Sequence, residues 1–377
     1  MRRTLIVTND FPPRRGGIQS FVHELALRLP PDQLTVYAPR WDGAAEFDAR
    51  QPFEVVRHPT SLMIPSPGVT RRALEIARAK KAEAVIFGAA APLGLITPAL
   101  RRGTSITRAI AITHGHEAGW AALPVARQLL RRIGEEVDVV TYLGEYFRVR
   151  VASALSPEAA ARMTRLAPGV DAAAFRPDPR AREALRQRHS LGDRPVVVCV
   201  SRLVPRKGQD TLIRAWPRVV AQVPDAALLI VGGGSYAGTL RTLAERTRIP
   251  HSIILTGAVP AGELAAHYWA GDVFAMPCRT RRRGLDVEGL GIVYLEASAA
   301  GLPAISGDSG GAPDAVLEGE TGYVVPGRDV AALADRIAGL LRDPSAARAM
   351  GHKGRDWVER DWTWDATADR LRALIDA

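Results

Sequence analysis

The sequence predicts an α/β protein of two doubly wound, Rossmann-like domains that face a central cleft. Three observations support this prediction. The chain has 377 residues, more than a single hydrophobic core usually organises. Short apolar runs rich in β-branched residues alternate with helical patterns, as in parallel sheets that helices cover on both faces. A passage rich in Pro, Gly and Asp at 167–179 interrupts this alternation and is interpreted as a linker.

The first half of the chain carries six candidate strands, most of them continuous apolar runs. Such runs indicate strands that are buried on both faces. We expect strands at Leu5–Thr8, Leu34–Ala38, Glu54–Arg57, Ala84–Phe87, Ala109–Thr113 and Val137–Thr141. Helices are expected at Ile18–Leu29, Arg71–Ala79 and Leu123–Ile133. These elements predict an N-terminal domain over 1–168.

The second half repeats the same alternation. We expect strands at Pro195–Ser201, Ala226–Val231, Ser252–Thr256, Asp272–Met276, Pro303–Ser306 and Gly322–Val325. Helices are expected at Thr211–Val223, Tyr236–Thr247, Ala261–Trp269, Ile292–Ala300, Val330–Leu341 and Trp364–Ile375. The C-terminal domain is predicted over 169–359, and the last helix, about 360–377, is expected to pack back on the first domain. Ligands of such sheets bind beyond the carboxyl ends of the strands.

Charge and composition narrow the classes of function. The formal net charge is +10, and residues 1–170 hold 23 Lys and Arg against 15 Asp and Glu. This excess predicts an anionic partner, which is a phosphate group, a nucleic acid or an acidic lipid surface, with simply solvated arginines as the alternative. Nucleic-acid binding is not expected, because no aromatic clusters interleave with basic residues. No apolar run suffices for a membrane span or a signal peptide, and only Cys199 and Cys278 occur, so a cytoplasmic, reduced protein is expected.

The first candidate strand ends at a Gly-Gly turn before a helix. Gly16 and Gly17 follow Arg14 and Arg15, so backbone can approach a ligand, and the helix N-terminus can offer N–H groups to a phosphate. The segment does not contain the Gly-Lys-Ser/Thr of a Walker loop. A plain tight turn is an equally good interpretation.

A basic loop follows the first strand of the second domain. Arg202 and Lys207 lie on it, five positions apart, where the carboxyl end of a strand allows both to converge on one anion. A departing pyrophosphate needs such charge when no metal neutralises it. The alternative is a solvated basic loop.

Two glutamates flank the start of another expected helix. Glu288 precedes the helix and Glu296 lies about two turns into it. At ~1.5 Å per residue they are roughly 12 Å apart, too far for the carboxylate pair of a retaining hydrolase. The spacing suits two carboxylates that hold different parts of an extended ligand. Between them, the N–H groups of Leu290, Gly291 and Ile292 are expected to hold phosphate oxygens.

The Glu-x7-Glu pattern and the upstream basic loop resemble retaining glycosyltransferase family 4, whose members have the GT-B fold. The resemblance covers essentially the whole chain. Within the family, four long segments are similar to the actinobacterial phosphatidylinositol monomannoside mannosyltransferases: Thr8–Gln19, Thr113–Gly119, Ser201–Asp210 and Gly284–Ala300.

This resemblance implies roles for single residues. Arg202 and Lys207 would bind the donor diphosphate. Glu288 would contact hydroxyls of the transferred sugar, and Glu296 would contact those of the ribose. His114, after a strand of the N-terminal domain, would face the sugar near the reacting carbon.

Further donor contacts follow from the same resemblance. Gly16 and Gly17 would let the donor phosphates and sugar approach the N-terminal domain. Val259 lies in the loop 257–261, whose backbone would read the base, although this loop has no acidic residue of the kind that some relatives direct at guanine. From the sequence alone, His116 is a candidate equal to His114.

The implied reaction is metal-independent transfer of α-mannose from GDP-mannose to a phosphatidylinositol mannoside lipid, with retention of configuration. No Asp-x-Asp motif occurs, and no cofactor is expected besides the donor substrate. The leaving phosphate itself would help deprotonate the incoming hydroxyl. Alternatives are another nucleotide sugar or acceptor within the same family, or a sugar-nucleotide epimerase.

The anionic acceptor predicts peripheral contact with the inner face of the plasma membrane. Thr70–Lys81 is a basic helix that suits acidic headgroups, although its scattered charges favour an ordinary surface helix. The basic run Arg279–Arg283 is a second candidate for acceptor contact, with a solvated loop as the alternative.

Overall fold

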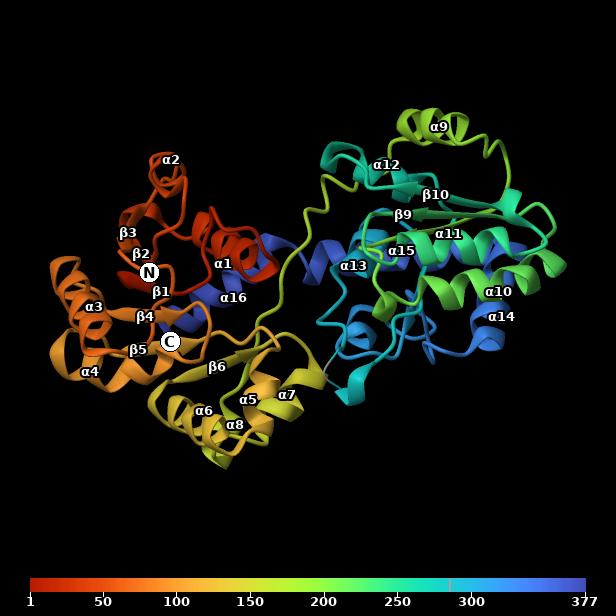
Figure 1. Ribbon diagram of the computed structural model, residues 1–377. Helices are drawn as coiled ribbons and strands as arrows, with labels where there is room; N and C mark the ends of the chain where they lie inside the picture. The colour runs from red at the N-terminus through yellow and green to blue at the C-terminus, as the bar shows by residue number, and fades with distance from the viewer. Residues whose placement is uncertain (285) are drawn as a thin grey trace. The chain divides into compact units, whose positions relative to one another are not determined.

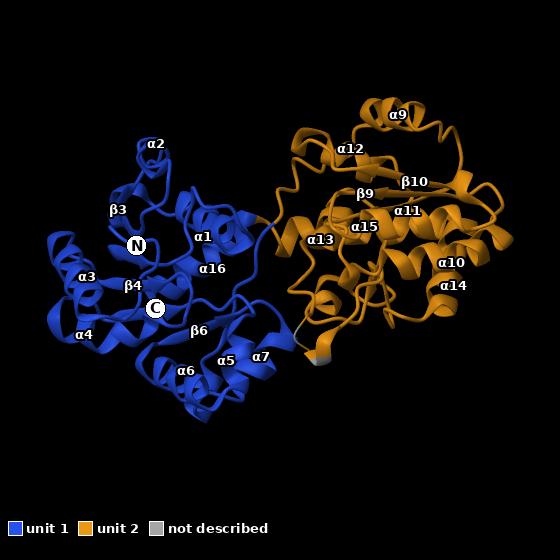
Figure 2. Ribbon diagram, in the orientation of Figure 1, with its two compact units in different colours: residues 1–169, 364–377 blue, residues 170–363 orange. Residues whose placement is uncertain are grey.

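The computed structural model describes residues 1–284 and 286–377 (Figure 1). It contains two compact units, shown in Figure 2: unit 1 is Met1–Gly169 with Trp364–Ala377, and unit 2 is Val170–Thr363. The divisions therefore fall at 169/170 and 363/364, where the sequence predicted 168/169 and 359/360. Each unit contains one parallel sheet with helices, which confirms two Rossmann-like domains. The cleft between them stays a prediction.

Unit 1 is built on a parallel sheet in the order β3-β2-β1-β4-β5-β6-β7 among the described residues. Its strands are β1 (Thr4–Val7), β2 (Leu34–Pro39), β3 (Glu54–His58), β4 (Ala84–Phe87), β5 (Arg108–Ala111), β6 (Val139–Tyr142) and β7 (Thr164–Arg165). Thr4 of β1 pairs with Leu34 on one side and with Ala84 on the other. Because β1 and β4 are buried along their whole length, these strands are continuous apolar runs. The strand order reverses at β1, so ligands are expected beyond its carboxyl end.

The helices of unit 1 cover this sheet, and the last of them comes from the end of the chain. They are α1 (Gly17–Leu27), α2 (Ala44–Asp48), α3 (Pro67–Ala79), α4 (Thr97–Gly103), α5 (Glu117–Ala122), α6 (Pro124–Glu136), α7 (Glu145–Ala152), α8 (Pro157–Ala161) and α16 (Trp364–Asp376). Arg108 donates a hydrogen bond to the Leu374 carbonyl at 2.7 Å, and the Phe21 and Trp364 rings are 5.9 Å apart. The C-terminal helix therefore packs on unit 1.

Unit 2 contains a second parallel sheet, with the described order β10-β9-β8-β11-β12-β13. Its strands are β8 (Val196–Val200), β9 (Ala227–Val231), β10 (Ile253–Gly257), β11 (Val273–Met276), β12 (Ala304–Gly307) and β13 (Gly322–Val325). Its helices are α9 (Pro179–Arg188), α10 (Gln209–Gln222), α11 (Ala237–Glu245), α12 (Leu264–Trp269), α13 (Ile292–Ala299), α14 (Val330–Arg342) and α15 (Pro344–Asp361). The order reverses at β8, which places the loops after β8 and β11 at the expected ligand site.

Helix α15 is a helix that the sequence did not predict. Gly351 and Gly354 lower its intrinsic helix propensity, but both are positions of close packing. A Cβ on Gly351 would lie 1.9 Å from the Gly301 carbonyl oxygen, and one on Gly354 would lie 3.2 Å from Cβ of Ser298. The glycines thus let α15 pack against α13, and tertiary packing outweighs local propensity.

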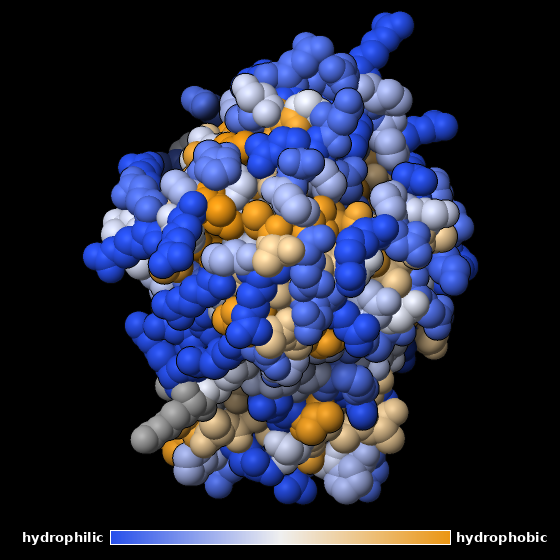
Figure 3. All heavy atoms as spheres, turned by 90° about the vertical axis from the view of Figure 1, so that its right-hand side faces the viewer, coloured by the Kyte–Doolittle hydropathy of each residue, from blue (hydrophilic) through white to orange (hydrophobic). Residues whose placement is uncertain are grey.

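Two further features concern the surface. None of the described helices combines the length and the apolar character that a membrane crossing needs. On the side of unit 2 that Figure 3 shows, hydrophilic side chains surround smaller groups of hydrophobic ones.

Candidate active site

The loops at the carboxyl ends of β8, β11 and β12 bring together the basic and acidic residues of unit 2. Lys207 ends a short 3-10 helix, Pro205–Lys207, directly before α10. Gly208 follows with a φ of +78°, and a Cβ there would lie 1.9 Å from the Pro277 carbonyl oxygen. Only glycine fits this close approach, so the basic loop packs against the segment that follows β11.

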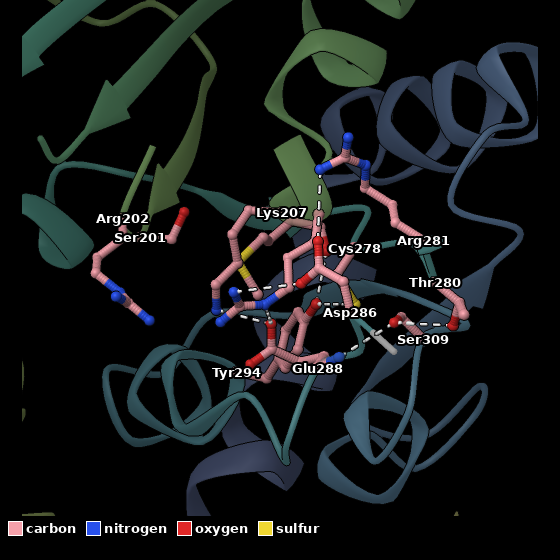
Figure 4. Close-up of polar contacts among 12 residues, drawn as sticks. Ser201, Arg202, Lys207, Cys278, Thr280, Arg281, Asp286, Glu288, Tyr294 and Ser309 are labelled. Carbon is pink, nitrogen blue, oxygen red and sulfur yellow. Dashed lines mark hydrogen bonds and ion pairs between the residues drawn. The ribbon is translucent and has the colours of Figure 1, made fainter. Parts of the chain in front are cut away.

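Lys207 and Glu288 form a buried ion pair (Figure 4). Lys207 Nζ lies 2.8 Å from Glu288 Oε2, and the two side chains are 9% and 7% exposed. Arg206 Nε lies 3.7 Å from the same oxygen. The acidic group expected to hold a sugar and the cation expected to hold a phosphate are therefore in direct contact.

Asp286 extends this ion pair into a network. Arg206 Nη1 lies 3.7 Å from Asp286 Oδ1, and Arg281 Nη1 lies 3.4 Å from Asp286 Oδ2. The Arg281 N–H also donates to the Asp286 carbonyl at 2.9 Å. Asp286 thus connects the loop after β8 with the loop after β11.

The basic run predicted as an acceptor contact is partly used inside the protein. Arg279 pairs with Asp210 at 2.8 Å and donates to Thr211 Oγ1 at 2.9 Å, while Arg281 pairs with Asp286. These two arginines fasten loops of unit 2, whereas Arg282 is exposed. The side chain of Arg283 lies outside the described structure.

Backbone contacts fix the position of Glu288. Its N–H donates to Ser309 Oγ at 3.2 Å, and its carbonyl accepts from Gly311 N–H at 3.1 Å. Gly310 has a φ of +58°, and a Cβ there would lie 2.0 Å from the Glu288 carbonyl oxygen. The segment after β12 therefore packs so closely that a side chain at position 310 would displace Glu288.

The N-terminus of α13 lies three residues beyond Glu288. Gly291 caps the helix with a left-handed φ of 76°. No described residue accepts a backbone hydrogen bond from the N–H groups of Leu290, Gly291 or Ile292. Tyr294 anchors the first turn because its buried hydroxyl donates to the Met276 carbonyl at 2.6 Å. Free N–H groups at a fixed helix N-terminus suit an anion.

Glu296 lies further along α13 and accepts a hydrogen bond from the Tyr268 hydroxyl at 2.6 Å. Burial raises the pKa of Glu296, while the Tyr268 hydrogen bond and the Lys207 ammonium oppose that rise. Tyr268 is fully buried, so it holds the Glu296 carboxylate in one orientation.

The remaining predicted donor residues of unit 2 lie on neighbouring loops. Arg202 follows β8 and is exposed, and no described residue forms an ion pair with it; Figure 4 draws it without a polar contact. Its convergence with Lys207 on one anion stays a prediction. Val259 is partly buried in the loop after β10. Beside this loop, Gly232 donates to the Gly257 carbonyl at 2.9 Å.

In unit 1, the Gly-Gly turn lies at the start of α1. Gly16 caps the helix in an extended conformation and Gly17 is its first residue. A Cβ on Gly16 would clash with the Gln19 side chain, which donates to Asp10 Oδ1 at 2.6 Å. Burial raises the pKa of Asp10, against the nearby charges of His116 and Arg14.

His114 and His116 follow β5 and differ in their surroundings. His114 Nε2 is bonded to the Gly88 carbonyl, which can only accept, so this nitrogen carries the proton. Burial lowers the pKa of His114 to about 4. His116 is 42% exposed and lies 3.3 Å from the fully buried carboxylate of Glu117. Glu117 Oε2 also accepts a hydrogen bond from the backbone N–H of His114 at 2.9 Å.

Several residues of the site were missed from the sequence. Arg206, Asp286, Ser309, Tyr268 and Glu117 hold the predicted residues in place. Ser309 stands beside a Gly-Gly pair and Glu117 beside two histidines, which are weak signals. Arg206 directly precedes Lys207 and Asp286 lies two residues before Glu288, which are weak signals too. Tyr268 has no local signal, because its partner Glu296 is 28 residues away.

Comparisons with known proteins assign the class. The family model for glycosyl transferases group 1 matches residues 181–357, and the model for glycosyltransferase family 4 matches residues 15–174. HepE of Anabaena, solved with UDP, superposes with a TM-score of 0.80 at 16% identity over 99% of both chains. A sucrose-phosphate synthase of Thermosynechococcus elongatus gives 0.74 at 22% identity over 99% of this chain and 98% of the other. The fold and the loop cluster thus define a GT-B glycosyltransferase.

Two curated relatives narrow the family. A GDP-mannose-dependent alpha-(1-6)-phosphatidylinositol monomannoside mannosyltransferase of Mycolicibacterium smegmatis is 55% identical over 375 residues, covering 98% of this chain and 97% of the relative. A GDP-mannose-dependent monoacylated alpha-(1-6)-phosphatidylinositol monomannoside mannosyltransferase of Corynebacterium glutamicum is 45% identical, covering 99% of this chain and 98% of the relative. The chain belongs to glycosyltransferase family 4. Within that family it belongs to the same group as these mannosyltransferases. The resemblance seen in the sequence is confirmed.

Proposed function

We propose that this enzyme transfers α-mannose from GDP-mannose to a phosphatidylinositol mannoside lipid, with retention of configuration. The observation that carries the proposal is the buried Lys207–Glu288 pair beside the open N-terminus of α13. This arrangement offers a cation and free N–H groups to a diphosphate, and a carboxylate to sugar hydroxyls. The identity to the two mannosyltransferases supports mannose as the sugar.

The donor diphosphate is proposed to bind Arg202, Lys207 and the N–H groups of 290–292. As the bond to the anomeric carbon breaks, negative charge develops on the diphosphate, and fixed donors in a buried site stabilise that charge. Lys207 is already desolvated in its pair with Glu288, so its charge acts over a short range with little screening. Arg202 is exposed and has no partner among the described residues, which leaves its guanidinium available to a ligand.

Glu288 is proposed to hold sugar hydroxyls rather than to attack the anomeric carbon. Its carboxylate forms an ion pair with Lys207, and hydrogen bonds at its N–H and its carbonyl fix its backbone. Retention then requires the departing phosphate oxygen to accept the proton of the incoming hydroxyl on the same face of the sugar. Glu296, held by Tyr268, is proposed to accept from the ribose hydroxyls.

His114 is proposed to contact the sugar as a neutral imidazole. Its pKa of about 4 keeps the ring uncharged near pH 7, and its proton is on Nε2 toward Gly88. The free lone pair on Nδ1 can therefore accept from a sugar hydroxyl. We propose that Gly16 and Gly17 admit the donor to unit 1, and that no divalent metal takes part.

The acceptor is proposed to be reached at the inner face of the plasma membrane by peripheral contact. The apolar residues of α3, among them Val69, Ala73 and Ile76, are buried in unit 1, so this helix presents its basic side to solvent. Directly before it, Leu62 and Ile64 are 62% and 56% exposed. Exposed apolar residues beside basic ones suit an acidic lipid surface.

A titration tests the donor assignment. Calorimetry with GDP-mannose, GDP-glucose, UDP-glucose and UDP-N-acetylglucosamine in EDTA should show clear preference for GDP-mannose. Preference for a UDP sugar would leave the family in place but overturn the donor. Loss of binding in EDTA would overturn metal independence. Release of GDP without acceptor, together with an altered sugar, would instead favour an epimerase.

Vesicle sedimentation tests the membrane contact. With vesicles containing phosphatidylinositol, Leu62→Ser/Ile64→Ser should bind several-fold more weakly than wild type. Val149→Ser, which alters another exposed apolar residue of unit 1 (57% exposed), serves as the control. Equal sedimentation of all three proteins would contradict the proposed surface.

A further inference from the structure

A cavity of about 850 Å³ lies within unit 2, away from the loops of the candidate active site. Pro195, Asp272 and Pro303 line it, and each immediately precedes a strand: β8, β11 and β12 respectively. The candidate active site follows the carboxyl ends of the same strands. The cavity is therefore at the opposite edge of the sheet.

The inner wall of the cavity is apolar. Trp269, Leu302, Leu340 and Leu341 line it, and the three leucines are 5–6% exposed. Trp269 ends α12, Leu302 lies in the connection between α13 and β12, and Leu340 and Leu341 lie in the last turn of α14. An apolar wall of this kind, in a cavity of this volume, matches the usual setting of a small-molecule site.

Some charged groups of the lining are already satisfied within the protein. Arg182 donates to Asp272 at 2.7 Å and to the Gly271 carbonyl at 2.7 Å. Arg355 donates to the Ala299 carbonyl at 2.6 Å and pairs with Glu359 at 2.7 Å. These arginines shape the cavity and are not available to a ligand.

Other basic side chains of the lining are available. Arg176, Arg348 and His352 are exposed, and no described residue forms a side-chain hydrogen bond or ion pair with them. Arg348 and His352 are four residues apart on α15, so they lie on one face of that helix. Among the lining carboxylates, Asp272 pairs with Arg182, Asp178 caps α9, and Asp193 also lines the cavity. The rim therefore carries charges of both signs, and Arg176 and Arg348 are the arginines available to an anion.

We propose that this cavity is a second ligand site, which takes a small organic anion carrying an apolar ring or chain. The apolar part would contact the wall of leucines and Trp269, and the anionic group would pair with Arg176 and Arg348. The two arginines come from the segment after the 169/170 division and from α15, which ends shortly before the 363/364 division.

Fluorescence titration of the full chain with 8-anilinonaphthalene-1-sulfonate, an aromatic sulfonate, tests the proposal. Saturable binding is expected, and saturating GDP should leave it unchanged because the nucleotide belongs to the other edge of the sheet. Arg176→Glu/Arg348→Glu should weaken binding about tenfold or more, since each arginine provides a charge-assisted hydrogen bond. The altered side chains are exposed, so folding should be preserved, as circular dichroism would verify.

Lys353→Glu is the matched control, since Lys353 is an exposed neighbour on α15 that does not line the cavity. It should bind the probe like wild type. Absence of saturable binding, displacement by GDP, or equal affinities of the double variant and the control would each overturn the proposal.

Discussion

Removal of either partner of the Lys207–Glu288 pair should destabilise unit 2. The nitrogen and oxygen are 2.8 Å apart, and both side chains are more than nine-tenths buried. Breaking a buried ion pair by removing one partner costs about 3–5 kcal/mol, because the other charge is left without compensation. Arg206, 3.7 Å from Glu288, offsets part of this cost in Lys207→Met, so about 3 kcal/mol is expected. For a unit the size of 170–363 this lowers Tm by about 6–12 °C.

A double-mutant cycle measured by calorimetric unfolding separates the pair from other effects. Lys207→Met, Glu288→Gln and the double variant should show a coupling energy of about 1–3 kcal/mol. Arg214→Met is the control, because Arg214 is 59% exposed and lies 3.8 Å from Asp210; its loss should stay below about 0.5 kcal/mol. Strictly additive single effects would refute the buried pair.

Three further predictions concern the rest of the site. The pKa of His114 is depressed to about 4 from 6.5, so between these pH values the unfolded chain binds more protons than the folded one. The free energy of unfolding should therefore fall as the pH falls from 6.5 to 4. Urea titrations of His114→Gln should show a smaller fall. Tyr268→Phe should weaken donor binding by about 0.5–1.5 kcal/mol through loss of the 2.6 Å bond to Glu296; unchanged calorimetric affinity would argue against a role for Glu296 in ribose binding. Gly310→Ala should abolish transfer and lower Tm, because its Cβ would meet the Glu288 carbonyl; a folded, active variant would contradict the packing described.

Much of the fold could be predicted because its strands are buried on both faces and therefore continuous in hydrophobicity. β8 and β9 are entirely buried, and they stand out from the helical segments without knowledge of their partners. Helix α15 could not be predicted in the same way, since its glycines make sense only against the Gly301 carbonyl and Ser298.

The site was predictable as a set of motifs but not as a set of contacts. Strand ends located Lys207 and Glu288 on one edge of the sheet, yet their ion pair depends on the order β8-β11-β12, which no local pattern encodes. Arg279 illustrates the same limit. It follows β11, whereas its partner Asp210 lies in the first turn of α10, 69 residues earlier in the sequence. The sequence therefore suggested a ligand or solvent for an arginine that the fold uses internally.

The central claim is mannose transfer from GDP-mannose to the glycolipid, and a transfer assay tests it most directly. The enzyme would be incubated in EDTA with GDP-mannose and vesicles containing phosphatidylinositol monomannoside, and the lipids analysed by mass spectrometry and NMR. The account predicts addition of one α-linked mannose by the wild type and none by folded Glu288→Ala. A product with inverted configuration, transfer only with added metal, or no transfer from GDP-mannose would contradict it.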